Sequence, residues 1–190
     1  MAPRIRSRKT TKISEWMEII AREVEFAEGA PPKIYHAVGQ PDYIGILAMT
    51  PSRQFPIVRQ YRPAVEAFTW ELPAGLVDAG ENPEQSCRRE LLEETGYSAA
   101  KVHKLGTAAP CTGRLSNRIH SFFVETGERK AGYAPEPGIE VKLVSAAELA
   151  RLIRAGEFVS QLHLGTILLA AMHSFIDLGT DFTVKGGRGR

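Results

Sequence analysis

Three carboxylates lie close together near the middle of the chain. Glu90, Glu93 and Glu94 are three and four residues apart, so on a helix all three would project near one face. Like charges at this spacing repel by roughly 0.2–0.5 kcal/mol per pair on an exposed helix, and by more where water is excluded. A hard divalent cation would offset this repulsion, and Mg²⁺ prefers such oxygen ligands. A solvated acidic face, neutralised by Arg88 and Arg89, is the alternative interpretation.

A longer pattern surrounds the carboxylates and favours the metal interpretation. It consists of Gly75, Glu81, Arg89, Glu90, Leu91, Glu93, Glu94, Gly96 and Tyr97. With average amino-acid usage, these nine constraints coincide by chance at about one starting position in 10⁹. The segment resembles the Nudix box, and the flanks Arg59–Arg62 and Trp70–Gly75 resemble those of ADP-ribose pyrophosphatases and related nucleotide-sugar hydrolases.

The resemblance implies a set of metal ligands. Glu90 and Glu94 would bind Mg²⁺, Glu93 would assist them in binding and catalysis, and the carbonyl of Ala74 would add a ligand. Mn²⁺ is the expected substitute for Mg²⁺.

The resemblance also implies substrate contacts outside the box. Arg62 would hold a phosphate or the terminal sugar, with an ion pair to Glu66 or Glu71 as the alternative. Glu71 is expected among the substrate contacts, and Trp16 would stack on the base. The alternative for Trp16 is a place in the core or in an interface.

The general base is expected from a late loop, with Glu140 as the first candidate and Glu136 as the second. An exposed position without a catalytic role is the alternative for Glu136. One departure from the family lies in the loop 109–117, where Thr112 and Gly113 replace the Pro-Gly pair of many ADP-ribose pyrophosphatases. The sequence therefore leaves the identity of the nucleotide sugar open.

The predicted activity is hydrolysis of the diphosphate of a nucleoside diphosphate sugar, giving a nucleoside monophosphate and a sugar phosphate. Three alternatives remain open: a dinucleotide such as NADH, a nucleoside triphosphate, or a Nudix-like module that binds a ligand without catalysis. Because its carboxylate set is intact, the chain fits an enzyme better than a binding module.

The composition sets further limits on function. The chain has 190 residues, 43% of them hydrophobic and 24% charged, and a net charge of +2. A charge this small does not point to nucleic acid, and no apolar run approaches the roughly 20 residues that span a bilayer. Cys87 and Cys111 have no metal-ligand spacing, and no secretory segment is recognisable, so we expect a cytoplasmic protein.

The elements that would position these residues alternate irregularly between strands and helices. Asn82, Pro83 and Gln85 form a capping-box pattern that opens a helix, and Gly96 would end it. Strands are expected at 43–49 and 55–61 as a hairpin, at 68–72, 102–107, 119–124 and 141–143, and as a pair within 16–38; further helices are expected after Ser145 and at 164–178. This order predicts an α/β fold of the α+β type, a mixed β-sheet sandwiched between helices.

The predicted domain organisation has three parts. Residues 1–40 form a basic arm and a small β subdomain, residues 41–180 the hydrolase domain, and residues 181–190 a flexible tail. The N-terminal strands have apolar faces that one small domain would bury poorly, so we expect a homodimer.

Overall fold

The computed structural model describes residues 2–177, which form ten strands and three helices. The tail predicted at 181–190 lies outside the described residues. The strands are β1 (Arg4–Lys12), β2 (Glu18–Glu25), β3 (Lys33–Gly39), β4 (Tyr43–Met49), β5 (Phe55–Arg62), β6 (Ala67–Glu71), β7 (Ala74–Leu76), β8 (Tyr97–Ala108), β9 (Ile119–Arg129) and β10 (Glu140–Val144). The helices are α1 (Pro83–Thr95), α2 (Ala146–Arg154) and α3 (Gln161–Met172).

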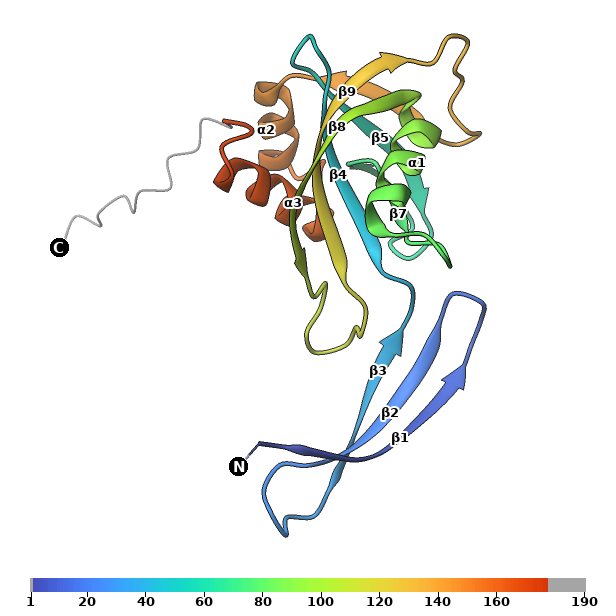
Figure 1. Cartoon of the computed structure of the whole chain (residues 1–190), viewed down its shortest axis with the longest axis vertical. Helices are drawn as coiled ribbons and strands as arrows, with labels where there is room; N and C mark the ends of the chain where they lie inside the picture. The colour runs from blue at the N-terminus through green and yellow to red at the C-terminus, as the bar shows by residue number, and fades with distance from the viewer. Residues whose placement is uncertain (1, 178–190) are drawn as a thin grey trace, which may run out of the picture.

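Two sheets form the body of the molecule. One is a mixed sheet in the order β7-β4-β9-β8, in which β4 and β9 run parallel and the other pairs are antiparallel. The other is antiparallel, in the order β10-β5-β6. Helix α1 lies on one side of this body and α2 and α3 lie on the other (Figure 1). The predicted fold, a mixed sheet between helices, is therefore confirmed.

Alternating side chains of β4 connect the two sides of the sheet. Ile44, Ile46 and Ala48 pack in one core cluster with Leu91 of α1, whereas Leu47 belongs to a second cluster that includes residues of α2 and α3. Successive side chains of a strand point to opposite faces, which explains the division. Helix α1 and the C-terminal helices α2 and α3 therefore pack against opposite faces of the same strand, β4.

The predicted hairpin of β4 and β5 is wrong. Residues 50–54 do form a turn, but β4 pairs with β7 and β9, whereas β5 pairs with β6 and β10. Both strands are largely buried, and each has a partner on both edges inside its own sheet, so neither has an edge left to pair with the other.

The N-terminal residues form a separate three-stranded antiparallel sheet in the order β1-β2-β3 (Figure 1). The two strands expected within 16–38 are confirmed as β2 and β3. The basic arm expected at the N-terminus is part of this sheet, because residues 4–12 form β1 and pair with β2 along its length. In the part of the chain that the structure describes, the helices are too short or too polar to cross a membrane.

Candidate active site

Helix α1 has well-defined ends that set the position of its carboxylates. The Asn82 side chain accepts hydrogen bonds from the backbone of Glu84 and Gln85, both at 3.0 Å, and the Gln85 side chain accepts from the Asn82 backbone at 2.8 Å. Gly96 ends the helix in the left-handed conformation, with φ of 77°. Both predicted caps are confirmed, and each such cap contributes about 1 kcal/mol to helix stability.

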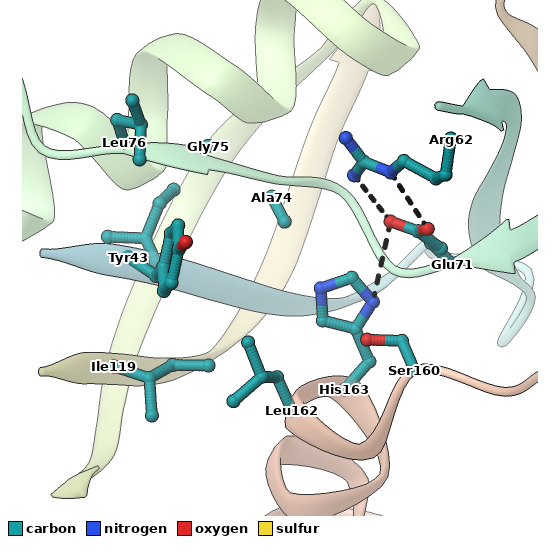
Figure 2. Close-up of a pocket in the computed structure, with 11 residues that line it drawn as sticks. Tyr43, Arg62, Glu71, Ala74, Gly75, Leu76, Ile119, Ser160, Leu162 and His163 are labelled. Atoms are coloured by element: carbon teal, nitrogen blue, oxygen red, sulfur yellow. Dashed lines mark hydrogen bonds and ion pairs between the residues drawn. The ribbon is translucent and has the colours of Figure 1, made fainter. Parts of the chain in front are cut away.

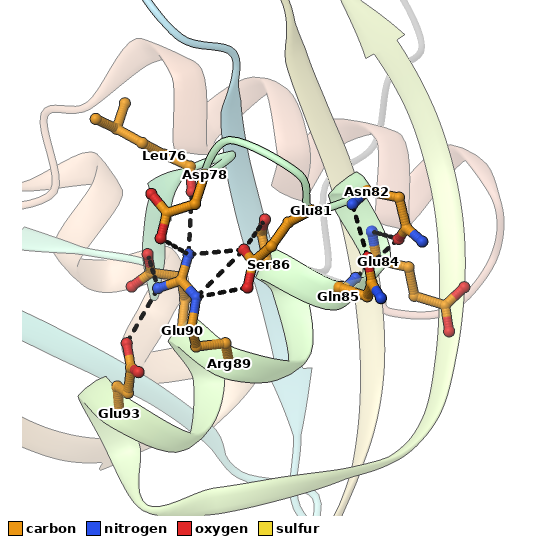
Figure 3. Close-up of polar contacts among 10 residues, drawn as sticks. All are labelled: Leu76, Asp78, Glu81, Asn82, Glu84, Gln85, Ser86, Arg89, Glu90 and Glu93. Atoms are coloured by element: carbon orange, nitrogen blue, oxygen red, sulfur yellow. Dashed lines mark hydrogen bonds and ion pairs between the residues drawn. The ribbon is translucent and has the colours of Figure 1, made fainter. Parts of the chain in front are cut away.

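Arg89 links two carboxylates of α1 with two carboxylates of the loop before it (Figure 3). Its guanidinium donates to Glu81, to Glu90 at 2.7 Å and to Glu93 at 3.1 Å, and it lies 3.3 Å from Asp78. Hydrogen bonds from Arg89 hold the pKa of Glu81 below its usual range. Arg89 therefore braces the loop before α1 against the helix and supplies part of the positive charge that the acidic cluster needs.

Glu94 is the buried member of the cluster, and Glu90 is partly buried. Glu94 is 9% exposed, and its carboxylate accepts a hydrogen bond from the backbone of Ala74 at 2.9 Å. Burial raises the pKa of Glu94 to about 8 and also raises the pKa of Glu90, and the charge of Glu90 adds to the effect on Glu94. A Cβ at Gly75 would lie 2.0 Å from a Glu90 oxygen, so only glycine allows this close approach.

The donor set fits a hard divalent cation better than a closed all-protein metal site. Among residues 2–177, no three His, Cys, Asp or Glu side chains are arranged to hold a metal ion together. Glu90 and Glu94 lie along the backbone of Ala74 and Gly75, while Glu93 is half-exposed and paired with Arg89. Two carboxylates with a neighbouring carbonyl suit Mg²⁺, which retains waters and takes its remaining oxygens from substrate.

A cavity of about 310 Å³ opens beside Ala74 and Gly75 (Figure 2). At one end Arg62 donates two hydrogen bonds to Glu71, at 2.9 and 2.5 Å. Burial opposes ionisation of Glu71, but hydrogen bonds from Arg62 and Thr69 outweigh it and hold the pKa of Glu71 below its usual range. The ion pair of Arg62 with Glu71, the alternative interpretation, is therefore present, and both residues also line the cavity.

Trp16 is not among the residues that line this cavity. Its ring is 59% exposed, lies in the turn between β1 and β2, and lines a second cavity of about 360 Å³ with Gln40 and Pro41. A place for Trp16 in the protein core is therefore wrong, whereas stacking and an interface both remain predictions.

The two candidate bases lie on adjoining segments. Glu140 begins β10 and pairs with Arg59 at 3.5 Å. Glu136 lies in the exposed loop before it, and the Tyr133 hydroxyl of that loop donates to the Glu93 carbonyl at 3.0 Å. The loop therefore reaches α1, and both base assignments stay predictions.

Comparison with known proteins agrees with this geometry. The sequence model of the NUDIX domain matches residues 39–162, well over half of the chain. The chain belongs to the Nudix family. It is therefore a Nudix hydrolase acting on pyrophosphate bonds.

Individual Nudix relatives are similar over most of the chain. The ADP-ribose pyrophosphatase of Bacillus subtilis strain 168 is 30% identical over 144 residues, which is 74% of this chain and 77% of that protein. The ADP-ribose pyrophosphatase of Mycobacterium tuberculosis is 33% identical over 136 residues, 69% of this chain and 64% of that protein. A crystal structure of an ADP compounds hydrolase superposes with a TM-score of 0.78 at 19% identity, over 91% of this chain and 94% of that one, which supports the Nudix fold.

Sequence reasoning missed one residue of the cavity, His163. It lies in the first turn of α3, is 5% exposed, and accepts a hydrogen bond from the backbone of Leu72 at 3.3 Å. No spacing in the sequence pairs His163 with its neighbours Glu71 and Arg62, because they are about 90 residues or more away. A histidine immediately before the apolar helix expected at 164–178 was the only local signal.

Proposed function

We propose that this Nudix hydrolase uses Mg²⁺ to cleave the diphosphate of a nucleoside diphosphate sugar, with ADP-ribose as the first candidate substrate. The products would be a nucleoside monophosphate and a sugar phosphate. The observation that carries the proposal is that a partly buried Glu90 and a buried Glu94 lie beside Ala74 and Gly75. Two neighbouring acids with raised pKa values need a cation before both can ionise. The similarity to two ADP-ribose pyrophosphatases supports the choice of substrate.

The metal would be held by Glu90, Glu94 and the carbonyl of Ala74, with Glu93 assisting. The chemistry that Mg²⁺, or Mn²⁺ in its place, would supply when bound is neutralisation of charge on the diphosphate and activation of the attacking water. Arg89 would keep the carboxylates in position through its hydrogen bonds to Glu90 and Glu93.

The other residues would orient substrate and accept a proton. Arg62 offers a planar fork of donors that suits a phosphate or a sugar, and Glu71 fixes its orientation from the buried side. Glu140, or Glu136 as the second candidate, would accept the proton of the attacking water. Trp16 would stack on the base, since its exposed ring lines a cavity of its own.

Turnover of purified protein against a substrate panel tests the proposal. We expect Mg²⁺-dependent release of a nucleoside monophosphate from ADP-ribose, ADP-glucose, UDP-glucose or GDP-mannose, and little turnover of NADH or dGTP. Glu90→Gln should be inactive, while Glu84→Gln on the exposed part of α1 should keep activity. Full activity of Glu90→Gln would contradict the metal assignment. Absence of turnover with every substrate of the panel would favour a binding module.

We also propose that residues 1–40 form a dimerisation subdomain, followed by a hydrolase domain at 41–180. Large apolar side chains are exposed on the N-terminal sheet and its turns, namely Ile5, Ile13, Trp16, Met17, Phe26, Ile34 and Tyr35. Exposed apolar surface of this extent marks an interaction site, and a second copy of the sheet is the simplest partner.

Analytical ultracentrifugation tests the dimer. We expect a species of twice the 20.9 kDa chain mass, and Ile34→Arg should weaken dimerisation by at least about ten-fold by placing a charge in the apolar contact. Val65→Arg is the matched control, because Val65 is similarly exposed, at 62% against 66%, but lies between β5 and β6. A wild-type protein that stays at 20.9 kDa at working concentrations would contradict the proposal.

A further inference from the structure

His163 is a buried histidine that the proposed hydrolysis does not use. It lines the same cavity as Arg62 and Glu71, together with Tyr43 and Ser160. Ser160 precedes α3, and its side chain makes no capping hydrogen bond to the helix. His163 and Ser160 therefore give the cavity a polar side at the start of α3, across the cavity from Ala74.

The ring of His163 has a defined orientation. Its Nδ1 accepts a hydrogen bond from the Leu72 backbone at 3.3 Å, and its Cδ2 lies near Gly45, where an added Cβ would be 3.8 Å away. At Gly45 a Cβ would also lie 2.9 Å from the Thr166 hydroxyl oxygen, so a side chain there would crowd the helix that carries His163. Because the backbone of Leu72 holds Nδ1 and the missing side chain at Gly45 leaves room for the ring, His163 is preorganised.

The hydrogen bond also defines the tautomer. A nitrogen that accepts from a backbone N–H has a free lone pair, so the proton of a neutral His163 ring is on Nε2. Burial lowers the pKa of His163 to about 4, which keeps the ring neutral near pH 7. The 4.0 Å contact between Nδ1 and Glu71 is then not an ion pair.

The Nε2–H of His163 is a free donor that faces the cavity. Figure 2 shows this nitrogen directed away from Glu71, toward the space between Tyr43, Ala74 and Leu162. Among residues 2–177, Nε2 has no hydrogen-bond partner. Nε2 is not among the buried polar atoms that lack a partner in the described residues, so it is accessible from the cavity, and a ligand oxygen that accepts from it gains affinity and selectivity.

We infer that His163 is a specificity-determining residue whose Nε2–H donates to an oxygen of the sugar phosphate half of the substrate. The inference rests on the proposed function, because it assigns one half of that substrate to this cavity. A volume of about 310 Å³ is at the lower end of small-molecule pockets, so it suits one half of a nucleotide sugar. The apolar side chains of Ile119 and Leu162 can cover the C–H face of a sugar, while His163, Ser160 and Tyr43 offer polar atoms to its oxygens.

The base is a poorer match for this cavity. Tyr43 is its only aromatic ring besides His163 among the described residues, and its hydroxyl already accepts from Gln40 at 2.5 Å. Stacking recognition of a base uses rings that can lie face to face with it. The nucleoside half would therefore lie outside this cavity.

Two substitutions separate the donor from the structural hydrogen bond. In His163→Asn, the amide oxygen can replace Nδ1 and accept from Leu72, but nothing replaces Nε2–H. In His163→Gln, the longer side chain can place its amide N–H where Nε2–H was. Thermal melting of both variants shows whether each is folded before binding is compared.

Calorimetric titration of the Mg²⁺-loaded protein with ribose 5-phosphate and, separately, with AMP is the experiment. We expect His163→Asn to weaken ribose 5-phosphate binding by about ten-fold, to leave AMP binding unchanged, and His163→Gln to recover most of the loss. Nitrogen NMR of the wild-type ring should show the Nε2–H tautomer, with a shift when ribose 5-phosphate is added.

Three results would overturn the inference: unchanged ribose 5-phosphate binding in His163→Asn, an equal loss of AMP binding, or equal losses in the Asn and Gln variants. Mg²⁺-dependent turnover by the wild type is measured in parallel. If the wild type turns over substrate but His163→Asn binds ribose 5-phosphate as tightly as the wild type, only the role of His163 is refuted. A donor-dependent affinity for ribose 5-phosphate without turnover refutes the proposed hydrolysis and supports the sugar phosphate site.

Discussion

Replacing Glu94 with glutamine is expected to abolish turnover and to stabilise the metal-free protein at pH 8. Turnover should fall by at least roughly 10²–10³-fold, the size found when one preorganised electrostatic group is removed from an active site. The amide oxygen of glutamine can still accept the hydrogen bond from Ala74, so the loss would reflect the missing charge. Kinetics with ADP-ribose and Mg²⁺ measures the first effect, and thermal unfolding in chelator measures the second.

The stability effect follows from the sign of the pKa shift. The pKa of Glu94 is about 8 in the folded protein, against 4.5 as its ordinary value. Between these values the folded state binds more protons than the unfolded state, so the contribution of Glu94 to stability falls as pH rises from about 4.5 to 8. Glutamine removes this loss, which is on the order of a few kcal/mol at pH 8.

The control for this prediction is Glu84→Gln. Glu84 is on the same helix, but its side chain is 55% exposed and pairs only with Arg88, so stability should change by about 0.5 kcal/mol or less. At pH 5 the Glu94→Gln variant and the wild type should differ little. A Glu94→Gln variant that is less stable than the wild type at pH 8 would show that Glu94 is ionised in the folded protein without metal.

The same shift predicts a pH dependence of metal binding. Because carboxylates must be deprotonated to bind a metal, the affinity for Mg²⁺ should rise by up to about ten-fold per pH unit below pH 8. Glu94 is thus costly to ionise without the cation and becomes a ligand when the cation is present. The function of Glu94 therefore lowers the stability of the metal-free protein.

The local part of this site was predictable from the sequence. The capping box at Asn82 and the end at Gly96 depend on contacts within a few residues, so the pattern alone located α1. The helical spacing of the carboxylates likewise placed Glu90 and Glu94 near each other. The sequence also predicted a cation for this cluster and named Arg89 as a neutralising residue, but not that Arg89 pairs with four carboxylates at once.

The non-local part could not be predicted. Strand β1 reads as a basic arm because its charged residues lack an apolar alternation, and only pairing with β2 makes it a strand. Strands β4 and β5 look like a hairpin because they are neighbours, but β4 pairs with β7 and β9, and β5 pairs with β6 and with the distant β10. His163 meets the Leu72 backbone only in the folded chain, 91 residues away, so no local pattern indicates its role.

Removal of Arg62 should destabilise the protein much more than removal of Arg59 from the same strand. The two arginine side chains are equally exposed, at 42% each, and each pairs with one carboxylate. Glu71, the partner of Arg62, is 7% exposed, whereas Glu140, the partner of Arg59, is 59% exposed. Arg62→Ala leaves a buried carboxylate without its cation and should cost about 3–5 kcal/mol. Arg59→Ala should cost about 1 kcal/mol or less.

The pH dependence distinguishes this mechanism from a general loss of packing. In the wild type the pKa of Glu71 is held low, so its contribution to stability is present above its ordinary pKa and is lost as pH falls through its folded value. Without Arg62, burial would dominate and raise the pKa of Glu71, so stability would instead fall as pH rises. The difference in unfolding free energy between wild type and Arg62→Ala should therefore be largest near pH 8 and shrink toward pH 4.

Denaturant unfolding across this pH range measures the difference, and a second variant tests its cause. Arg62→Ala combined with Glu71→Gln removes the unpaired charge, while Thr69 can still donate to the remaining amide oxygen. The double variant should be more stable than Arg62→Ala alone near pH 8. If the two are equally unstable at every pH, the guanidinium stabilises the fold by packing, and the buried ion pair is not what holds β5 and β6 at the cavity.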